Sequence, residues 1–370
     1  MSKLNIFLIL LNFCCCIVIS AQDNNSWPSS RGNPALTGVS NVQITSKPTL
    51  LWIYNTGDKT KSSPVIYDGN IYIGSSNGFL YSVSDKGKLN WKFSAGTGIE
   101  APPLIHNNNV YFGSLEGIVY AINAKTCKVI WKYVTEGQIS GAVNYFIAQG
   151  KTTHLIVGSY DFSLHCIDEI TGKLIWKFPT DNYINGTPAN DGKTVVFGGC
   201  DGQLRVINVN TGKLIQHTDI GTYIPGSPAI ENNMAYFGNY DGEFFCVNFI
   251  DKSNIWKYSG AGPFMGAPSL FGNKVVIGSE DKYIYCFNKN DGKLIWKHKT
   301  LGKITGSPLI AGESVILSSG DGRVYMLDLN SGKETWSFDM GSPSESTPAI
   351  TRNLMVIAGT NGTLYGFGIK

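Results

Sequence analysis

The residues that could perform acid–base or metal chemistry are five regularly spaced aspartates and five scattered histidines. The aspartates recur every 40 residues, at Asp161, Asp201, Asp241, Asp281 and Asp321. Carboxylates that converge in a fold can bind a cation or transfer a proton. Each of these aspartates, however, stands between two apolar runs, where tight-turn geometry favours Asp. We therefore predict that they shape turns.

The histidines do not indicate a catalytic or metal site either. His106, His154, His165, His217 and His298 stand at different positions relative to the 40-residue interval, so we do not expect them to converge as metal ligands. The sequence contains no Gly-x-Ser-x-Gly nucleophile motif and no phosphate-binding loop. The interval itself is therefore the most informative feature.

Tryptophans and prolines mark eight copies of one repeat. The tryptophans are spaced by 39, 40, 45, 80, 40 and 40 residues, and Gln216 fills the gap of 80; they are Trp52, Trp91, Trp131, Trp176, Trp256, Trp296 and Trp336. Prolines run in step, with Val143 at the one missing place; they are Pro64, Pro103, Pro188, Pro228, Pro268, Pro308 and Pro348.

Each copy reads as four short strands. Alternation such as that of residues 70–73 has the period of two expected of half-buried strands. Pairs such as Asp201-Gly202 and Asn361-Gly362 predict tight hairpins. Radial stacking of eight four-stranded antiparallel sheets would cover all but short edges, which predicts an all-β, eight-bladed β-propeller.

The chain ends predict how the ring closes. The last copy stops at Lys370 without a tryptophan strand, and residues 50–54 supply such a strand before the first copy. We therefore predict that this N-terminal strand completes the eighth blade. An open solenoid is the alternative, but it leaves the split copy unexplained.

Three segments are predicted along the chain. Residues 1–21 form a signal peptide, because Lys3 precedes an apolar run from Ile6 to Ile19 that is too short for a membrane span of ~20 residues. Residues 22–48 form a loosely ordered lead-in strapped to the rim, and residues 49–370 form the propeller. Export to the periplasm or the outer-membrane periphery, or to the cell surface or medium, follows. A lipid anchor at Cys14, Cys15 or Cys16 stays open.

Cysteines and charge exclude other classes. Five cysteines follow the leader, and an obligatory disulfide framework is not expected because a chain of this length can bury a large core; they are Cys127, Cys166, Cys200, Cys246 and Cys286. Cys166, Cys246 and Cys286 share one repeat position and are predicted to be buried free thiols. The redox state of the five stays open. The net charge is +3, and the lysines follow the repeat, which predicts an evenly solvated outer surface. No nucleic-acid site is expected.

The loops before each marker proline predict a binding mouth. The residues three places before these markers form a ring in which Glu345, Lys61 and Glu100 come from consecutive blades. Tyr183, Tyr223 and Phe264 would give the opposite side an aromatic arc suited to a peptide or a sugar. Packing between blades is the alternative for each of these rings.

The repeat resembles the quinoprotein-like (PQQ-like) propeller family. Residues 166–176 match that family's phrase closely, and the resemblance extends from about residue 50 to residue 370. It implies that each tryptophan listed above docks between blades. The short loops are most similar to the BamB-type subunits of bacterial outer-membrane assembly, which implies an exported, non-catalytic, monomeric scaffold that binds an assembly protein.

Two other functions are compatible with this resemblance. A carbohydrate- or surface-binding propeller is suggested by the aromatic arc. A PQQ-dependent dehydrogenase is disfavoured because the loops that build its site are minimal here and no Cys-Cys pair lies outside the leader. Neither pyrroloquinoline quinone (PQQ) nor Ca²⁺ is therefore expected.

Overall fold

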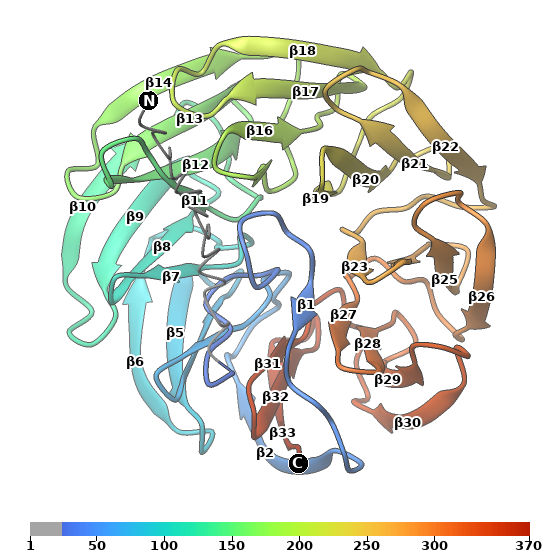
Figure 1. Cartoon of the computed structure of the whole chain (residues 1–370). Coiled ribbons are helices and arrows are strands. Elements are labelled where there is room, and N and C mark those ends of the chain that lie inside the picture. Colours follow the sequence, from blue (N-terminus) through green and yellow to red (C-terminus); the bar gives the residue numbers. More distant parts are fainter. Residues whose placement is uncertain (1–23) are drawn as a thin grey trace, which may run out of the picture.

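Antiparallel hairpins make up the regular structure of the computed structural model, which describes residues 24–370. This range holds 33 strands and no helix. The strands form eight sheets, each built on four antiparallel strands and arranged around a central axis (Figure 1). The predicted eight-bladed β-propeller is confirmed.

Blades 1 to 4 follow one another along the chain, with the first strand of each nearest the axis. Blade 1 consists of β3 (Val65–Tyr67), β4 (Asn70–Gly74), β5 (Phe79–Ser84) and β6 (Leu89–Ser94). Blade 2 consists of β7 (Leu104–His106), β8 (Asn109–Gly113), β9 (Ile118–Asn123) and β10 (Val129–Val134). Blade 3 consists of β11 (Asn144–Ile147), β12 (Thr153–Ser159), β13 (Ser163–Asp168) and β14 (Leu174–Pro179). Blade 4 consists of β15 (Ala189–Asn190), β16 (Thr194–Phe197), β17 (Gln203–Asn208) and β18 (Leu214–Asp219).

Blades 5 to 8 complete the ring. Blade 5 consists of β19 (Ala229–Glu231), β20 (Met234–Gly238), β21 (Glu243–Asn248) and β22 (Asn254–Ser259). Blade 6 consists of β23 (Ser269–Phe271), β24 (Lys274–Gly278), β25 (Tyr283–Asn288) and β26 (Leu294–Lys299). Blade 7 consists of β27 (Leu309–Ala311), β28 (Ser314–Ser318), β29 (Arg323–Asp328) and β30 (Glu334–Asp339), with β1 (Val39–Ser40) added inside. Blade 8 consists of β31 (Ala349–Ile350), β32 (Leu354–Ala358), β33 (Thr363–Gly368) and β2 (Thr49–Asn55).

Blade 8 joins the two ends of the described chain. The N-terminal strand β2 pairs antiparallel with β33, and Trp52 lies opposite Gly366. This pairing satisfies the outer edge of β33, which would otherwise be exposed. Closure by an N-terminal strand is therefore confirmed.

The core is distributed between blades. The second and third strands of each blade are buried on both sides by neighbouring sheets, whereas the fourth strand alternates exposed and buried residues, as in β14. Hairpins between first and second strands, and between third and fourth strands, form one face of the ring, called the lead-in face below. The other loops form the mouth face.

The lead-in is ordered, which corrects the prediction of a loose strap. Its backbone follows the free inner edges of the first strands, and successive carbonyls accept hydrogen bonds from one blade after another. The donors are the amides of Arg352, Ile66, Ile105, Asn190, Ile230, Leu270 and Ile310, and the side chain of Asn144 supplies the bond from blade 3. Inner strand edges need partners, and the lead-in supplies them.

Arg31 fixes the lead-in between blades 6 and 7. Its guanidinium donates to the carbonyls of Pro268 and Pro308, each at 2.6 Å, and to Ser269 Oγ at 2.9 Å. Burial lowers the pKa of Arg31 to about 9. The lead-in therefore anchors deep in the ring, rather than on its rim.

Two predictions concern the N-terminus of the chain. The signal peptide at residues 1–21 and the cysteines at positions 14–16 lie outside the described residues. Within residues 24–370, the structure contains no helix long and apolar enough to cross a membrane. All five cysteines of this range are free, with Cys166, Cys246 and Cys286 buried and Cys127 and Cys200 partly exposed.

Candidate functional site

The mouth face opens into a small cup on the axis. The cup encloses about 230 Å³, and its lining includes the predicted ring positions Lys61, Ser140, Asn185, Pro225, Met265, Thr305 and Glu345. Glu100, the remaining ring position, does not line the cup but forms an ion pair with Lys61 at 3.0 Å. The structure thus brings the predicted charged residues together at one side of the mouth.

Glycines let the loops pack tightly around the cup. A Cβ on Gly226 would lie 2.7 Å from the carbonyl oxygen of Gly266, and a Cβ on Gly186 would lie 2.8 Å from that of Gly226. Contacts this short do not occur with real side chains, so glycine is required where neighbouring loops touch. The sequence carried this signal two residues before several marker prolines.

Hydroxyl groups of the repeated Ser-Pro and Thr-Pro pairs tie neighbouring loops together. Ser227 Oγ accepts from the amide of Thr187 at 2.8 Å, and Ser307 Oγ accepts from that of Ala267 at 2.9 Å. Ser63 Oγ accepts from the amide of Thr347 across the closure of the ring. The rim is therefore a connected frame rather than a set of independent loops.

Lys61 is the cation of this rim. Its hydrogen bond with Glu100 raises its pKa, burial opposes that change, and Glu345 adds to the increase. Lys61 and Glu345 are both exposed, whereas Glu100 is partly buried. A charged partner would therefore meet Lys61 and Glu345 first.

An aromatic arc lies on the mouth face, but it is formed by two stacked tyrosine pairs rather than by the three predicted residues. Tyr183 stacks on Tyr160 with ring centroids 4.6 Å apart, and Tyr223 stacks on Tyr240 at 4.5 Å. Tyr183 is 41% exposed and Tyr240 is 44% exposed. Tyr160 and Tyr240 were not predicted, although each directly precedes one of the regularly spaced hairpin aspartates.

Phe264 does not belong to this arc. It is 0% exposed and packs against Phe244 and Tyr285. Pro263, 40 residues after Tyr223, occupies the tyrosine position, while Phe264 stands where Ile224 stands in the previous blade. The prediction was wrong because it placed this ring one residue out of register.

The hairpin aspartates act mainly in turns, as predicted. Asp201, Asp281 and Asp321 each accept a hydrogen bond from the amide two residues later. Asp161 instead contacts the buried His165 at 3.0 Å. Among residues 24–370, no group of three or more His, Cys, Asp or Glu residues is placed to hold a metal ion.

Indoles connect successive blades. Six of the seven predicted tryptophans donate through Nε1 to a carbonyl in the next blade; they are Trp52, Trp91, Trp131, Trp176, Trp256 and Trp296. Gln216 makes the equivalent bond to Phe249. Trp336 packs on Phe367 at 5.4 Å instead, because β33 is not followed by a turn to its fourth strand.

A buried carboxylate connects blades 2 and 3 near the lead-in face. Glu169 lies 2.6 Å from His106 Nδ1 and accepts hydrogen bonds from Tyr111 and Asn107. Burial opposes ionisation, but these hydrogen bonds hold the pKa of Glu169 below its ordinary value. This cluster is fully engaged within the protein, so it is a structural clasp.

The two faces carry opposite charge. The mouth-face connections between strands hold twelve acidic residues and four lysines; the acids are Asp58, Glu100, Glu116, Glu136, Asp161, Asp181, Asp201, Asp241, Glu280, Asp281, Asp321 and Glu345. The lead-in-face turns hold seven acids and thirteen bases; the bases are Lys86, Lys88, Lys125, Lys128, Lys151, Lys173, Lys193, Lys213, Lys252, Lys289, Lys293, Lys333 and Arg352. The sequence predicts an even spread of lysines over the surface, and the structure shows that this prediction is wrong.

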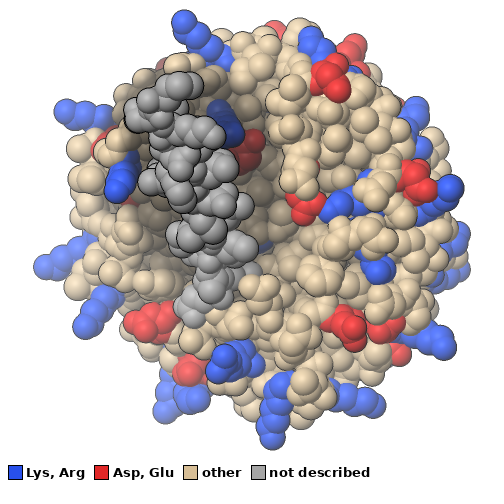
Figure 2. Space-filling model, in the orientation of Figure 1, with Lys and Arg blue, Asp and Glu red and all other residues tan. Residues whose placement is uncertain are grey.

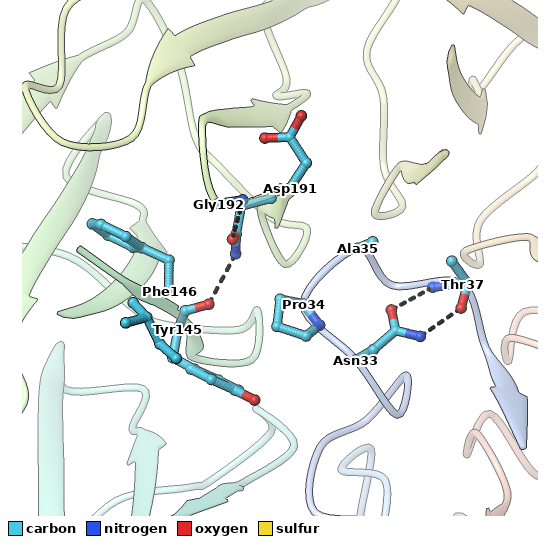
Figure 3. Close-up of a pocket in the computed structure, with 10 residues that line it drawn as sticks. Asn33, Pro34, Ala35, Thr37, Tyr145, Phe146, Asp191 and Gly192 are labelled. Atoms are coloured by element: carbon cyan, nitrogen blue, oxygen red, sulfur yellow. Dashed lines mark hydrogen bonds between the residues drawn. The ribbon is translucent and has the colours of Figure 1, made fainter. Parts of the chain in front are cut away.

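The lead-in face also contains an apolar pocket beside blades 3 and 4. It encloses about 450 Å³ between the lead-in, at Pro34 and Ala35, and the strand ends at Tyr145 and Phe146 (Figure 3). Asn190 bridges the two blades there by donating to the carbonyl of Tyr145 at 3.0 Å. The predicted site residues do not line this pocket.

Comparison with known proteins gives one family. The model of the family described as outer membrane protein assembly factor BamB matches residues 39–258 and again residues 251–370. No curated protein matches the chain.

Solved structures share the fold at low sequence identity. BamB from Moraxella catarrhalis is 16% identical with a TM-score of 0.74, covering 87% of this chain and 100% of that chain. A quinohemoprotein alcohol dehydrogenase from Comamonas testosteroni is 13% identical with a TM-score of 0.79, covering 95% of this chain and 81% of that chain. A europium-containing methanol dehydrogenase is 12% identical with a TM-score of 0.77, covering 94% of this chain and 99% of that chain.

Proposed function

Because this chain belongs to the family of the outer membrane protein assembly factor BamB, we propose that it is an exported, non-catalytic scaffold that binds a protein of outer-membrane assembly. The observation that carries this proposal is the mouth face, whose short loops are tied into a rigid frame. A rigid surface loses little conformational freedom on binding, which favours protein recognition.

The chemistry of the mouth face suits a cationic protein segment. Its loops hold twelve acidic residues against four lysines, and Lys177 and Arg205 pair with three of the acids from neighbouring strands. The excess of acids still gives this face a negative field that would steer such a partner. The exposed tyrosine pairs supply the amphipathic rings that protein interfaces favour. We place the contact on the side of blades 3 to 5, where Tyr183 and Tyr240 are exposed.

A quinone cofactor with a divalent cation fits this mouth poorly. The cup is smaller than ordinary cofactor pockets, which range over ~300–1,000 Å³. Its lining holds no aromatic ring to stack on a planar quinone, and Lys61 stands beside the carboxylates that a cation would need. Dehydrogenase activity is therefore not part of the proposal.

A glycan-binding propeller is the second candidate. The exposed faces of Tyr183 and Tyr240 are its support, because sugars pack on such rings through their C–H groups. This candidate predicts that a soluble oligosaccharide competes with the natural partner, whereas the scaffold proposal predicts that it does not.

Site-specific crosslinking in the native envelope tests the proposal. A photoreactive phenylalanine analogue is placed at Tyr183 or at Tyr240, and the matched control carries it at Ile170 on the lead-in face. We expect the two mouth-face probes to crosslink a protein of the outer-membrane assembly machinery. Crosslinks to glycans alone, or dye-linked alcohol oxidation by the purified protein with PQQ and Ca²⁺, would refute it.

A further inference from the structure

We infer that the lead-in face docks on an anionic lipid surface through blades 2 to 4. This inference is independent of the proposed function, which uses the opposite face. It rests on a basic patch of six exposed lysines in consecutive turns: Lys125, Lys128, Lys151, Lys173, Lys193 and Lys213. None of the six is in an ion pair with another described residue.

Acidic side chains offset this patch only in part. The turns of blades 2 to 4 on this face contain Glu169 and Asp191, and Glu169 is buried in its clasp with His106. Asp168, the last residue of β13, is the one further carboxylate at these turns, and it accepts hydrogen bonds from Thr171. Lys and Arg side chains project around the whole circumference of the molecule, including the side of β7 to β14 (Figure 2). The patch therefore has a positive field directed to solvent, which attracts anionic headgroups.

Exposed aliphatic side chains within the patch favour a lipid surface over other anionic partners. Ile170 is 75% exposed in the turn between β13 and β14, and Ile147 is 61% exposed at the end of β11. Both lie on blade 3, flanked by the lysines of all three blades. Basic residues around exposed aliphatic side chains are the pattern of a surface that rests at the boundary of headgroups and acyl chains.

A nucleic acid would gain little from contact with Ile147 and Ile170. Its backbone offers phosphates to lysines, but single strands are held by aromatic stacking, which the exposed isoleucines cannot supply. The exposed aromatic rings of this protein lie instead on the mouth face, among acidic residues that would repel a nucleic acid. Of the two faces, as residues 24–370 form them, the lead-in face is the one that combines a net positive charge in its turns with exposed aliphatic side chains.

Vesicle co-sedimentation of the full chain tests the inference. The probes are phosphatidylcholine vesicles with and without phosphatidylglycerol. The patch variant is Lys151→Ser/Lys173→Ser/Lys193→Ser, and the matched control on the mouth face is Lys59→Ser/Lys282→Ser/Lys303→Ser. Every protein keeps residues 1–23, so any contribution of that segment is common to all.

We expect the patch variant to lose roughly 100-fold in partitioning to anionic vesicles, since each lysine near such a surface contributes about fivefold. The control should change by less than about threefold, and Ile147→Ser/Ile170→Ser should weaken the binding that persists at high salt. Melting temperatures of all variants exclude misfolding.

Three results would overturn the inference. One is equal binding of the unmodified chain to both kinds of vesicle, which needs no variant. Another is unchanged binding by the patch variant. The third is tight binding to duplex DNA, lost in the patch variant, without any preference for anionic vesicles.

Discussion

Replacing Gln216 with tryptophan tests how the blades are fastened together. In the regular blades the indole lies against a turn glycine: a Cβ on Gly332 would come within 2.6 Å of Trp296, and a Cβ on Gly292 within 2.6 Å of Trp256. The turn that faces Gln216 carries Lys252 instead, at φ 65°. The missing indole and a missing glycine therefore face each other at this pair of blades, although Cys127 replaces the glycine opposite Trp91 as well.

The expected energies follow from this pairing. Gln216→Trp alone should destabilise the protein by about 1–3 kcal/mol, because the new ring meets the Cβ of Lys252. Lys252→Gly alone should be nearly neutral, since relief of left-handed backbone strain of ~1 kcal/mol is offset by the entropy of glycine. Together they should restore the regular fastening and gain about 1–2 kcal/mol of apolar burial.

The coupling between the two substitutions is thus expected to be about 2–5 kcal/mol and favourable. The assay is a double-mutant cycle by calorimetry at one scan rate. The double variant should melt roughly 4 °C or more above Gln216→Trp, given about 2 °C per kcal/mol for a chain of this size. The matched control, Gly332→Lys, should lower the melting temperature because Trp296 occupies that site.

Trp91 shows how much a Cβ in the facing turn disturbs an indole. Its turn carries Cys127 at φ 59°, and Trp91 is only partly buried although it still donates to Ala124 at 3.0 Å. A Cβ at this position is therefore costly rather than prohibitive. If Gln216→Trp had the same effect with Lys252 as with glycine there, the explanation of the turn glycines would be refuted.

Three further predictions concern stability. Deleting residues 49–56 removes β2, so the exposed edge of β33 should cause aggregation and a lower melting temperature; an unchanged, monomeric protein would contradict the closure. Glu169→Gln should destabilise by about 2 kcal/mol at neutral pH; because the folded pKa of Glu169 is depressed, the difference should be constant above about pH 4.3 and disappear as pH falls through the folded value. Phe264→Ala should cost ~3–5 kcal/mol, whereas Tyr183→Ser should cost less than about 1 kcal/mol, which thermal unfolding of the two variants would separate.

The regular part of the architecture was predictable because each blade repeats the same local physics. Alternation, hairpin glycines and the tryptophan interval specify strands and turns, and the split copy at the chain ends specifies β2 as the closing strand. The ring of mouth residues followed from repeat position alone, which is why the sequence predicts that Lys61 and Glu345 lie on the same side of the mouth.

Features that break the repeat were harder to predict. Phe264 was misplaced because Pro263 holds the tyrosine position, and a one-residue shift exchanges a surface site for a core site. The lead-in has no period of its own, so its pairing with inner strand edges depends on a channel that exists only after the ring forms. The separation of charge between faces likewise requires knowing which turns share a face.

The path of the lead-in has a mechanical consequence. A pull on the N-terminal side of Asn24 is resisted first by hydrogen bonds to successive blades, from the amide of Arg352 in blade 8 to that of Ile310 in blade 7. Only after these are broken does tension reach β2, whose pairing with β33 keeps the ring shut. A force on the N-terminal side is therefore borne first by the hydrogen bonds between the lead-in and the inner strands. The pairing of β2 with β33, which closes the ring, bears it only afterwards.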